Sequence, residues 1–250
     1  MHMDIVDLRQ FYATPRGTLA RKHIQSALNA IWKPVSDERL VGFGYPTLFL
    51  DAFRSDAERT IAFMPAAQGA QKWPAAEPGS TALVFEEDLP LPDSSIDRLL
   101  VVHAFEHCEN PHETLQEFWR VLSPGGRLVI VAPNRRGVWA RTERTPFGVG
   151  RPYTGGQLAT ILRQNMFTPT AWVDALHFPP SNNRLVQKAA GTLERLGRRF
   201  TPAFAGVIIV EATKQLYQGL PVRQRLSRRV FVPVLAPQGA ARAPARRVSK

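Results

Sequence analysis

Cysteine is nearly absent from this chain: Cys108 is the only one among 250 residues. One cysteine cannot form an intrachain disulfide, and it cannot supply the paired thiolates of the common structural zinc sites. Three of the six histidines, His103, His107 and His112, lie close together in the sequence. Their spacing matches no familiar metal-binding motif, so we expect no metal centre.

Long hydrophobic runs are also missing. No stretch reaches the roughly 18 consecutive apolar residues of a membrane-spanning helix. The first residues, MHMDIVDLRQ, lack the apolar centre of a signal peptide. We therefore expect a cytoplasmic protein without a transmembrane segment.

Acidic residues are absent from the last part of the chain. Residues 221–250 contain eight Lys or Arg and no Asp or Glu, whereas the rest has 24 basic and 21 acidic residues. The net charge of +11 therefore belongs mainly to this segment. Its Pro, Ala and Arg content predicts disorder, at least from residue 233 onward. Such a basic tail could contact nucleic acid or an acidic partner, although a solvated tail without a specific role is the simpler interpretation.

What the sequence does contain is an alternation of strand-like and helix-like segments. Helical spacing of apolar residues predicts two helices within residues 4–32, and a further helix is expected at residues 46–57. A capping pattern starts another helix at Asn110. Apolar segments of strand length occur seven times, at residues 39–46, 60–65, 81–87, 97–105, 127–133, 170–178 and 205–214. The first five alternate with helices or loops, which predicts an α/β fold with a largely parallel sheet.

Residues 83–134 add a more specific signal. They include EEDLPLPD (86–93), HAFEH (103–107) and WRVLSPGG (119–126), and this succession resembles the second half of a class I S-adenosylmethionine-dependent methyltransferase of the type 11-like family. The resemblance implies a Rossmann-like, seven-stranded, mostly parallel sheet with an antiparallel last strand and helices on both faces. It also implies S-adenosylmethionine as the cofactor. We expect an N-terminal helical cap (1–34), a methyltransferase-like domain (35–220) and the basic tail (221–250).

The glycine motif expected after the first strand is degenerate. Gly42 and Gly44 are present, and the resemblance assigns them and Tyr45 to the cofactor site. Relatives usually carry an acid two residues before the first glycine and a third glycine two residues after the second. Here these positions are Leu40 and Pro46, so the usual contact to the methionine part of the cofactor is missing.

The rest of the expected cofactor site is also altered. Relatives bind the ribose through an acid at the end of the second strand, where this chain has Met64, with Gln68 as a candidate substitute. The acidic turn supplies Asp88 or Glu86 for the adenine amino group and Leu89 for the ring. By the same resemblance, His103 borders the methyl-donor pocket and Tyr12 covers the cofactor.

Three residues are candidates for catalysis: Glu106, His107 and Tyr153. A histidine near a transferable methyl group can act as a general base because its pKa lies near neutrality. The connection after the fifth strand interleaves arginines with aromatic residues, a pattern suited to an anionic or stacked substrate. Its members are Arg135, Arg136, Trp139, Arg141, Arg144, Phe147, Arg151 and Tyr153.

The predicted function is methyl transfer from S-adenosylmethionine to an unidentified acceptor, either a small molecule or RNA. The alternative is a catalytically inactive methyltransferase-like protein that acts as a binding module or heterodimer partner, associated with RNA or the ribosome. The sequence is also compatible with a homodimer. A dinucleotide-binding oxidoreductase is a third hypothesis, but the full Gly-x-Gly-x-x-Gly motif is absent.

Overall fold

The computed structural model describes residues 3–32, 35–75 and 78–217. One compact unit spans Met1–Gln218, so the two N-terminal helices belong to the same unit as the sheet. The predicted basic tail lies outside the described residues. Within the described part of the chain, no helix is long and apolar enough to cross a bilayer.

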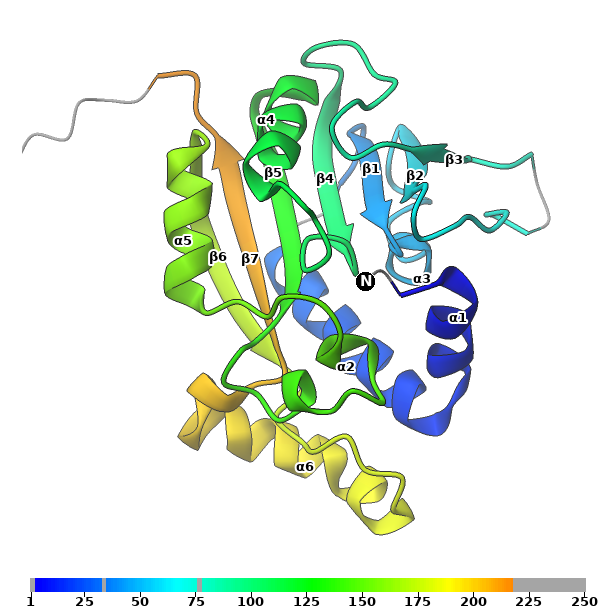
Figure 1. Cartoon of the computed structure of the whole chain (residues 1–250), viewed down its shortest axis with the longest axis vertical. Helices are drawn as coiled ribbons and strands as arrows, with labels where there is room; N and C mark the ends of the chain where they lie inside the picture. The colour runs from blue at the N-terminus through cyan, green and yellow to red at the C-terminus, as the bar shows by residue number, and fades with distance from the viewer. Residues whose placement is uncertain (1–2, 33–34, 76–77, 218–250) are drawn as a thin grey trace, which may run out of the picture. The chain divides into compact units, whose positions relative to one another are not determined.

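Seven strands form one sheet in the order β3-β2-β1-β4-β5-β7-β6 (Figure 1). Strand β7 runs antiparallel to both of its neighbours, and the other adjacent pairs are parallel. This arrangement confirms the predicted mostly parallel sheet with a reversed last strand. The strands are β1 (Arg39–Gly44), β2 (Arg59–Pro65), β3 (Thr81–Val84), β4 (Ile96–Val102), β5 (Leu122–Pro133), β6 (Phe167–Ala175) and β7 (Val207–Lys214).

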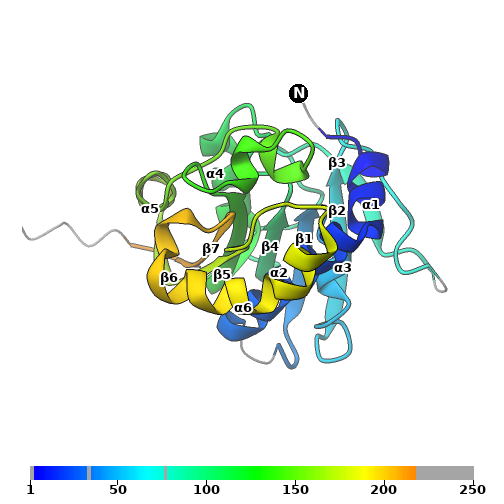
Figure 2. The same cartoon turned by 90° about the horizontal axis from the view of Figure 1, so that it is seen from below.

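Helices cover both faces of the sheet (Figure 2). Helices α4 (Pro111–Val121) and α5 (Gly155–Gln164) pack on one face. The other face is covered by α1 (Ile5–Ala13), α2 (Pro15–Ile31), α3 (Thr47–Leu50) and α6 (Arg184–Phe200). Three short 3-10 turns complete the unit: η1 (Trp139–Arg141), η2 (Pro146–Gly148) and η3 (Pro202–Phe204).

Strand β4 shows why the central strands are apolar along their whole length. Leu99 and Val101 point into the core under α4 and α5. Leu100 and Val102 alternate with them and point into the core on the α1–α2 side. Because successive side chains of a strand face opposite sides, a strand buried on both faces must be apolar at every position.

The helix after β1 is shorter than the sequence predicts. Apolar spacing suggests a helix through residues 46–57, but α3 covers only Thr47–Leu50, and turns follow it. Asp51 accepts a hydrogen bond from the indole nitrogen of Trp73 at 2.8 Å, and Phe53 packs on Trp32 with ring centroids 4.9 Å apart. These tertiary contacts hold the segment in turns. Strand β3 also ends earlier than expected, at Val84 instead of residue 87.

The carboxyl ends of the parallel strands meet at one edge of the sheet. In Figure 1 the arrows of β1 and β4 point to this edge, where α1 lies. The candidate site is at this edge, as expected for open α/β sheets.

Candidate functional site

The glycine turn after β1 is fixed by the neighbouring strand. Gly44 has a φ of +92°, and a Cβ there would lie 2.2 Å from the carbonyl oxygen of Val102. The next amide, that of Tyr45, donates to this same oxygen at 2.7 Å. A Cβ on Gly42 would meet the side chains of Pro46 and Leu50 at 2.5 and 2.7 Å. Packing within the chain therefore explains both glycines, and the space beside Gly42 is filled by the chain's own side chains.

A buried polar cluster lies at the ends of β2 and β4. His103, at φ +52°, accepts or donates a hydrogen bond at Nε2 with the hydroxyl of Tyr12, 2.7 Å away. Its carbonyl oxygen accepts a hydrogen bond from the side-chain nitrogen of Gln68 at 2.8 Å. Its other ring nitrogen, Nδ1, lies 3.4 Å from Oε1 of Glu106. Tyr12 and Glu106 thus contact the imidazole of His103, and Gln68 contacts its backbone.

The cluster holds polar atoms that the fold does not satisfy. Glu106 is only 2% exposed. Neither oxygen of its side chain has a hydrogen-bond partner among the residues that the structure describes. Oε1 of Gln68 is likewise buried and unpaired within the described chain. Leaving a buried polar group unsatisfied is costly, and these acceptors are available to a ligand that carries hydrogen-bond donors.

Aromatic side chains enclose this cluster. The ring of Tyr12 stacks on Tyr45 with centroids 5.9 Å apart, and Phe49 meets Tyr12 edge-on at 6.2 Å. Phe147 lies on His103 at 5.0 Å, and Trp139 packs on Phe147 at 5.5 Å. Trp139 and Phe147 are buried core residues. In the unliganded structure both side chains are therefore packed inside the protein and not exposed to solvent.

A small acid-lined cavity of about 210 Å³ opens at the ends of β2 and β3. Glu86, Glu87 and Glu109 line it, together with the apolar side chains of Pro65, Ala66, Ala67, Val84 and Phe85. Of the two candidate acids in the turn, Glu86 lines the cavity and Asp88 does not. The amide of Leu89 donates to Oε1 of Glu117 at 2.7 Å and is already engaged. Glu109 joins the cavity although it carries no sequence signal.

Met64 and Gln68 flank the cavity residues Pro65, Ala66 and Ala67 in the sequence, and both are buried. The sulfur of Met64 accepts a hydrogen bond from the amide of Gln71 at 3.3 Å. The structure thus brings Tyr12, Tyr45, Met64, Gln68, His103 and Glu106 together in the buried part of the edge. His107 lies apart from them, against Gly150: a Cβ on that glycine would be 2.9 Å from the imidazole.

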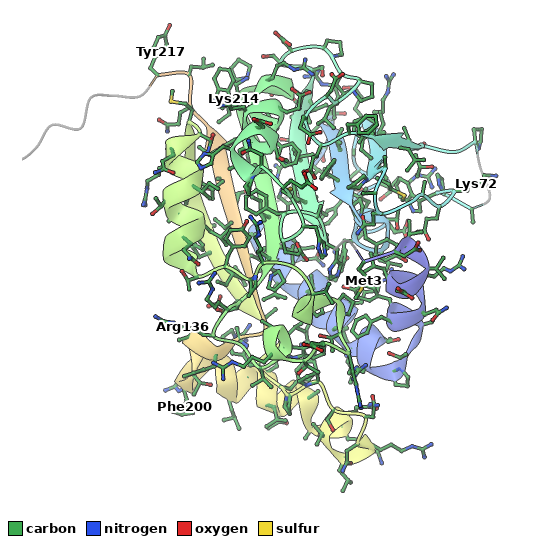
Figure 3. The ribbon with its side chains drawn as sticks, viewed as in Figure 1. Met3, Lys72, Arg136, Phe200, Lys214 and Tyr217 are labelled. Atoms are coloured by element: carbon green, nitrogen blue, oxygen red, sulfur yellow. The ribbon has the colours of Figure 1, made fainter. Side chains whose placement is uncertain are left out.

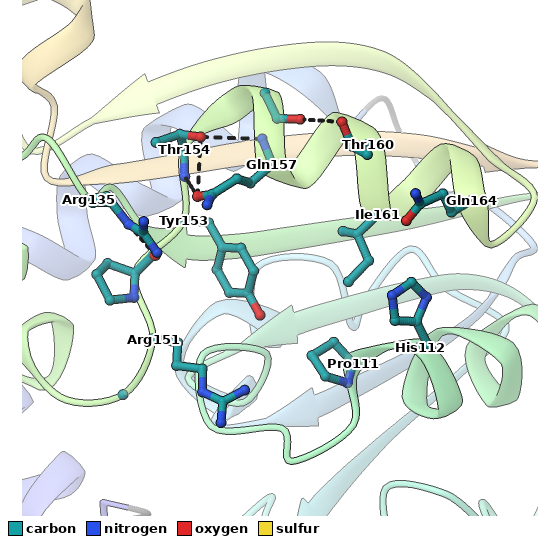
Figure 4. Close-up of a pocket in the computed structure, with 13 residues that line it drawn as sticks. Pro111, His112, Arg135, Arg151, Tyr153, Thr154, Gln157, Thr160, Ile161 and Gln164 are labelled. Atoms are coloured by element: carbon teal, nitrogen blue, oxygen red, sulfur yellow. Dashed lines mark hydrogen bonds between the residues drawn. The ribbon is translucent and has the colours of Figure 1, made fainter.

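Tyr153 is separated from the buried cluster. Its ring packs on Phe105 at 5.2 Å, on the α4–α5 side of the sheet, and its hydroxyl donates to the carbonyl of Phe105 at 3.5 Å. Tyr153 lines a shallow cavity of about 910 Å³ between α4 and α5, with His112, Arg135 and Arg151 (Figure 4). The three predicted catalytic residues therefore occupy three different surroundings, and only Glu106 belongs to the buried cluster.

Burial controls the protonation of the phenols and the thiol. Burial raises the pKa of Tyr12 well above its ordinary value, with Tyr45 adding to the shift. Burial also raises the pKa of Tyr153 to about 12. The pKa of the Cys108 thiol is raised, again mainly by burial. Both phenols and this thiol are therefore protonated near neutral pH, so none of them is a base or nucleophile in this state. No group of three or more metal-ligating side chains is found in the described part of the chain.

Comparison with known proteins points to one family. Residues 49–130 match the profile of the family described as methyltransferase domain. A demethylmenaquinone methyltransferase of Thermus thermophilus is 31% identical over 106 residues, which cover 41% of this chain and 47% of the relative. An uncharacterized methyltransferase of Mycobacterium bovis is 34% identical over 114 residues, covering 40% and 46%. The chain thus spans about half the length of the curated relatives it matches.

Solved structures share the fold at low sequence identity. A Haloferax volcanii methyltransferase, solved in complex with the Trm112 methyltransferase activator, has a TM-score of 0.60 at 18% identity, covering 86% of this chain and all of that one. A SAM-dependent methyltransferase of Archaeoglobus fulgidus gives 0.57 at 15% identity, covering 82% and 97%. The [4+2]-cyclase SpnF gives 0.51 at 17%, covering 78% and 81%, so the fold alone does not fix the reaction. The profile match over residues 49–130, the relatives and the structural neighbours together indicate a methyltransferase domain of the class I S-adenosylmethionine-dependent type.

Proposed function

We propose that this protein transfers a methyl group from S-adenosylmethionine to a small acceptor molecule in the cytoplasm. The observation that carries the proposal is the buried carboxyl group of Glu106, whose oxygens lack hydrogen-bond partners in the described chain. It lies beside His103 at the edge of the sheet where this family binds its cofactor. A group with N–H or O–H donors is needed to satisfy it.

The adenine end of the cofactor fits the acid-lined cavity. An adenine ring requires apolar walls and an acceptor for its exocyclic amino group. Ala66 and Val84 provide the walls, and Glu86 provides a carboxyl oxygen that can only accept when ionised. We assign this cavity to adenine.

The methionine end fits the polar cluster in its chemistry. The family's usual acid before the glycine turn is replaced by Leu40, which leaves the cofactor's ammonium group without its customary partner. Glu106 offers a replacement carboxyl group, and Oε1 of Gln68 is a further unpaired acceptor within the described residues. Tyr12 and Tyr45 are buried over this region, so binding requires α1 to shift.

The catalytic assignment follows from the contacts of His103. Glu106 faces Nδ1, which favours a proton on that nitrogen and leaves Nε2 as an acceptor. Nε2 is now occupied by the hydroxyl of Tyr12. Moving α1 would free it to accept the proton of the attacking group, with Glu106 stabilising the resulting imidazolium. When bound, S-adenosylmethionine supplies the electrophilic methyl group.

The acceptor is proposed to be a planar aromatic molecule. Tyr12 and Phe147 pack against His103, and Phe11 packs against both of them. Such side chains favour an aromatic ring over a phosphate chain. Two of the relatives are demethylmenaquinone methyltransferases, which supports the same choice. RNA remains the alternative acceptor, for which the basic C-terminal residues 221–250 are the only support.

Calorimetric titration of the full chain with S-adenosylhomocysteine tests the proposal. We expect micromolar affinity for the wild type and a loss of about tenfold or more in Glu106→Gln, because a charged hydrogen bond contributes about 1.5–3 kcal/mol. Glu113→Gln is the matched control, since Glu113 is exposed in the first turn of α4. Unchanged affinity in Glu106→Gln would remove this residue from the site.

Failure of the wild type to bind at millimolar ligand would favour the second candidate, a non-catalytic partner protein. Two observations support that candidate: Leu83 and Phe85 are exposed at the β3 end of the sheet, and the Haloferax neighbour is held by an activator protein. A pull-down with the full chain would then replace the activity assay.

A further inference from the structure

Helix α6 exposes two parallel stripes of opposite character. Residues Leu185, Ala189, Leu196 and Phe200 follow one another at intervals of four, seven and four, which places them along one line of a helix. Leu185, Leu196 and Phe200 are 74%, 50% and 69% exposed. Beside this apolar stripe runs a basic stripe at the same intervals: Arg184, Lys188, Arg195 and Arg199.

The inner face of α6 anchors the helix without either stripe. Ala190 and Glu194 are buried against the rest of the unit. The carboxyl oxygens of Glu194 accept hydrogen bonds from the amides of Leu176 and His177 at 3.0 and 2.6 Å. Gly197 packs tightly on His177, since a Cβ there would lie 2.3 Å from Cβ of the histidine. The exposed stripes therefore contribute nothing evident to the fold.

The charge of α6 has one sign. The helix contains five basic residues and one acid, and that acid is Glu194, which is engaged on the inner face. Phe204, in the following turn η3, is also 58% exposed. Figure 3 labels Phe200 on the outer side of the unit, at the end of α6. The described chain thus presents an apolar line bordered by positive charge.

We infer that α6 and η3 dock on the surface of an anionic lipid bilayer. A helix with Lys and Arg beside a stripe of Leu and Phe lies in the membrane interface, where the apolar side chains enter the acyl boundary and the charges meet the headgroups. Charge complementarity favours anionic lipid over a neutral surface. A nucleic acid would satisfy the arginines but would offer no apolar phase to leucine and phenylalanine.

The position of α6 relates this docking to the candidate site. The helix lies at the end of the unit toward which the β1 and β4 arrows point, which is also the edge of the candidate site (Figures 1 and 2). The segment leading into α6 contacts the aromatic enclosure: the carbonyl of Phe178 accepts a hydrogen bond from the indole nitrogen of Trp139 at 2.6 Å. A docked protein would therefore hold the edge that carries His103 close to the lipid. The docking itself does not depend on methyl transfer.

Vesicle flotation with the full chain tests the inference. We expect the wild type to float with vesicles of phosphatidylcholine and phosphatidylglycerol in equal parts, and to float poorly with phosphatidylcholine alone. Leu196→Ser/Phe200→Ser should weaken binding about tenfold or more, and Arg195→Glu/Arg199→Glu on the order of a hundredfold. All of these side chains are exposed, so unchanged thermal unfolding would show that the variants fold.

Two control variants match these changes elsewhere on the surface. Val6→Ser/Trp172→Ser removes exposed apolar side chains, and Arg9→Glu/Arg59→Glu reverses two exposed charges. Each control variant should bind anionic vesicles more tightly than the α6 variant that it matches. Residues 221–250 are present in every protein, so their eight basic residues cannot explain a difference between variants.

Three results would overturn the inference. The first is a wild type that does not float with anionic vesicles. The second is wild-type flotation by Leu196→Ser/Phe200→Ser, because the apolar stripe would then have no part in binding. The third is a loss of vesicle binding that occurs only in Arg195→Glu/Arg199→Glu and disappears at raised salt, together with competition by RNA for the same arginines. Persistence of the Leu196→Ser/Phe200→Ser defect at raised salt would support insertion into lipid.

Discussion

Replacing Glu106 by glutamine should stabilise the unliganded protein while weakening its affinity for S-adenosylhomocysteine. The two side chains have nearly the same shape, so packing is retained. The carboxyl group of Glu106 is 2% exposed and has no hydrogen-bond partner among the described residues. An unsatisfied buried polar group costs about 1–3 kcal/mol, and more when it is charged. Glutamine is polar but carries no charge, so the part of this cost that comes from burying a charge is removed. We therefore expect Glu106→Gln to raise the free energy of unfolding by about 2 kcal/mol.

Thermal unfolding followed by circular dichroism measures this gain. One kcal/mol corresponds to about 2–4 °C in a domain of this size, so the melting temperature should rise by about 4–8 °C. Glu113→Gln should change it little, because that side chain is exposed. Saturating S-adenosylhomocysteine should stabilise the wild type and the control far more than Glu106→Gln. A melting temperature lowered by Glu106→Gln would refute the reasoning, since the carboxyl group would then make stabilising contacts.

Three further predictions concern the frame of the site. Gly44→Ala should lower the free energy of unfolding in urea by about 3 kcal/mol, because its Cβ would meet the carbonyl oxygen of Val102. Gly191→Ala, where no atom lies within 4 Å of the new Cβ, should stabilise α6 by up to about 1 kcal/mol. Equal effects of the two substitutions would contradict the packing argument. Hydrogen bonds from Arg39 lower the pKa of Asp97 to about 2, so its contribution to stability is present above its unfolded value of 3.8 and is lost as the pH falls toward 2. Asp97→Asn should flatten stability against pH in that window, and an unchanged acid profile would exclude the ion pair as the cause. Arg120→Ala should lower the free energy of unfolding by about 2 kcal/mol, because the carboxyl group of Glu117 loses its partner at 2.6 Å. The same substitution should weaken ligand binding at the neighbouring acidic turn. Arg120→Lys should recover only part of the loss.

The sheet could be predicted because its signal is local. Each central strand is buried on both faces, so an apolar run of the right length marks it, and Ser-Pro-Gly-Gly at 123–126 marks the entry to β5. The helix after β1 could not be predicted at its true length. Its end depends on Asp51 meeting Trp73, a contact that spans a loop of undistinguished composition. Local propensity favours helix there, and the tertiary contact prevails.

The candidate site could be predicted only in part. The resemblance named Tyr12, Gln68, His103 and Glu106, and these four residues do meet. It gave no means to pair Tyr12 with His103, because 91 residues separate them and no periodicity connects them. Tyr153, in the connection after β5, is a catalytic candidate together with Glu106, yet it packs on the α4–α5 face of the sheet. The path of the chain decides on which face of a sheet a loop residue packs, and this path cannot be predicted from composition.

The buried glutamates of this fold provide the strongest argument for a ligand. Four are buried among the described residues: Glu106, Glu117, Glu194 and Glu211. Glu117 is paired with Arg120, Glu194 accepts two backbone amides, and Glu211 is paired with Arg127 and Thr170. The chain therefore satisfies buried carboxyl groups wherever they serve the fold. Glu106 differs from them: within the described residues neither of its oxygens has a hydrogen-bond partner, and Oε1 has the imidazole of His103 beside it at 3.4 Å. It lies at the carboxyl edge of the sheet. This position of Glu106 supports the proposal that its carboxyl group binds the ammonium group of the cofactor.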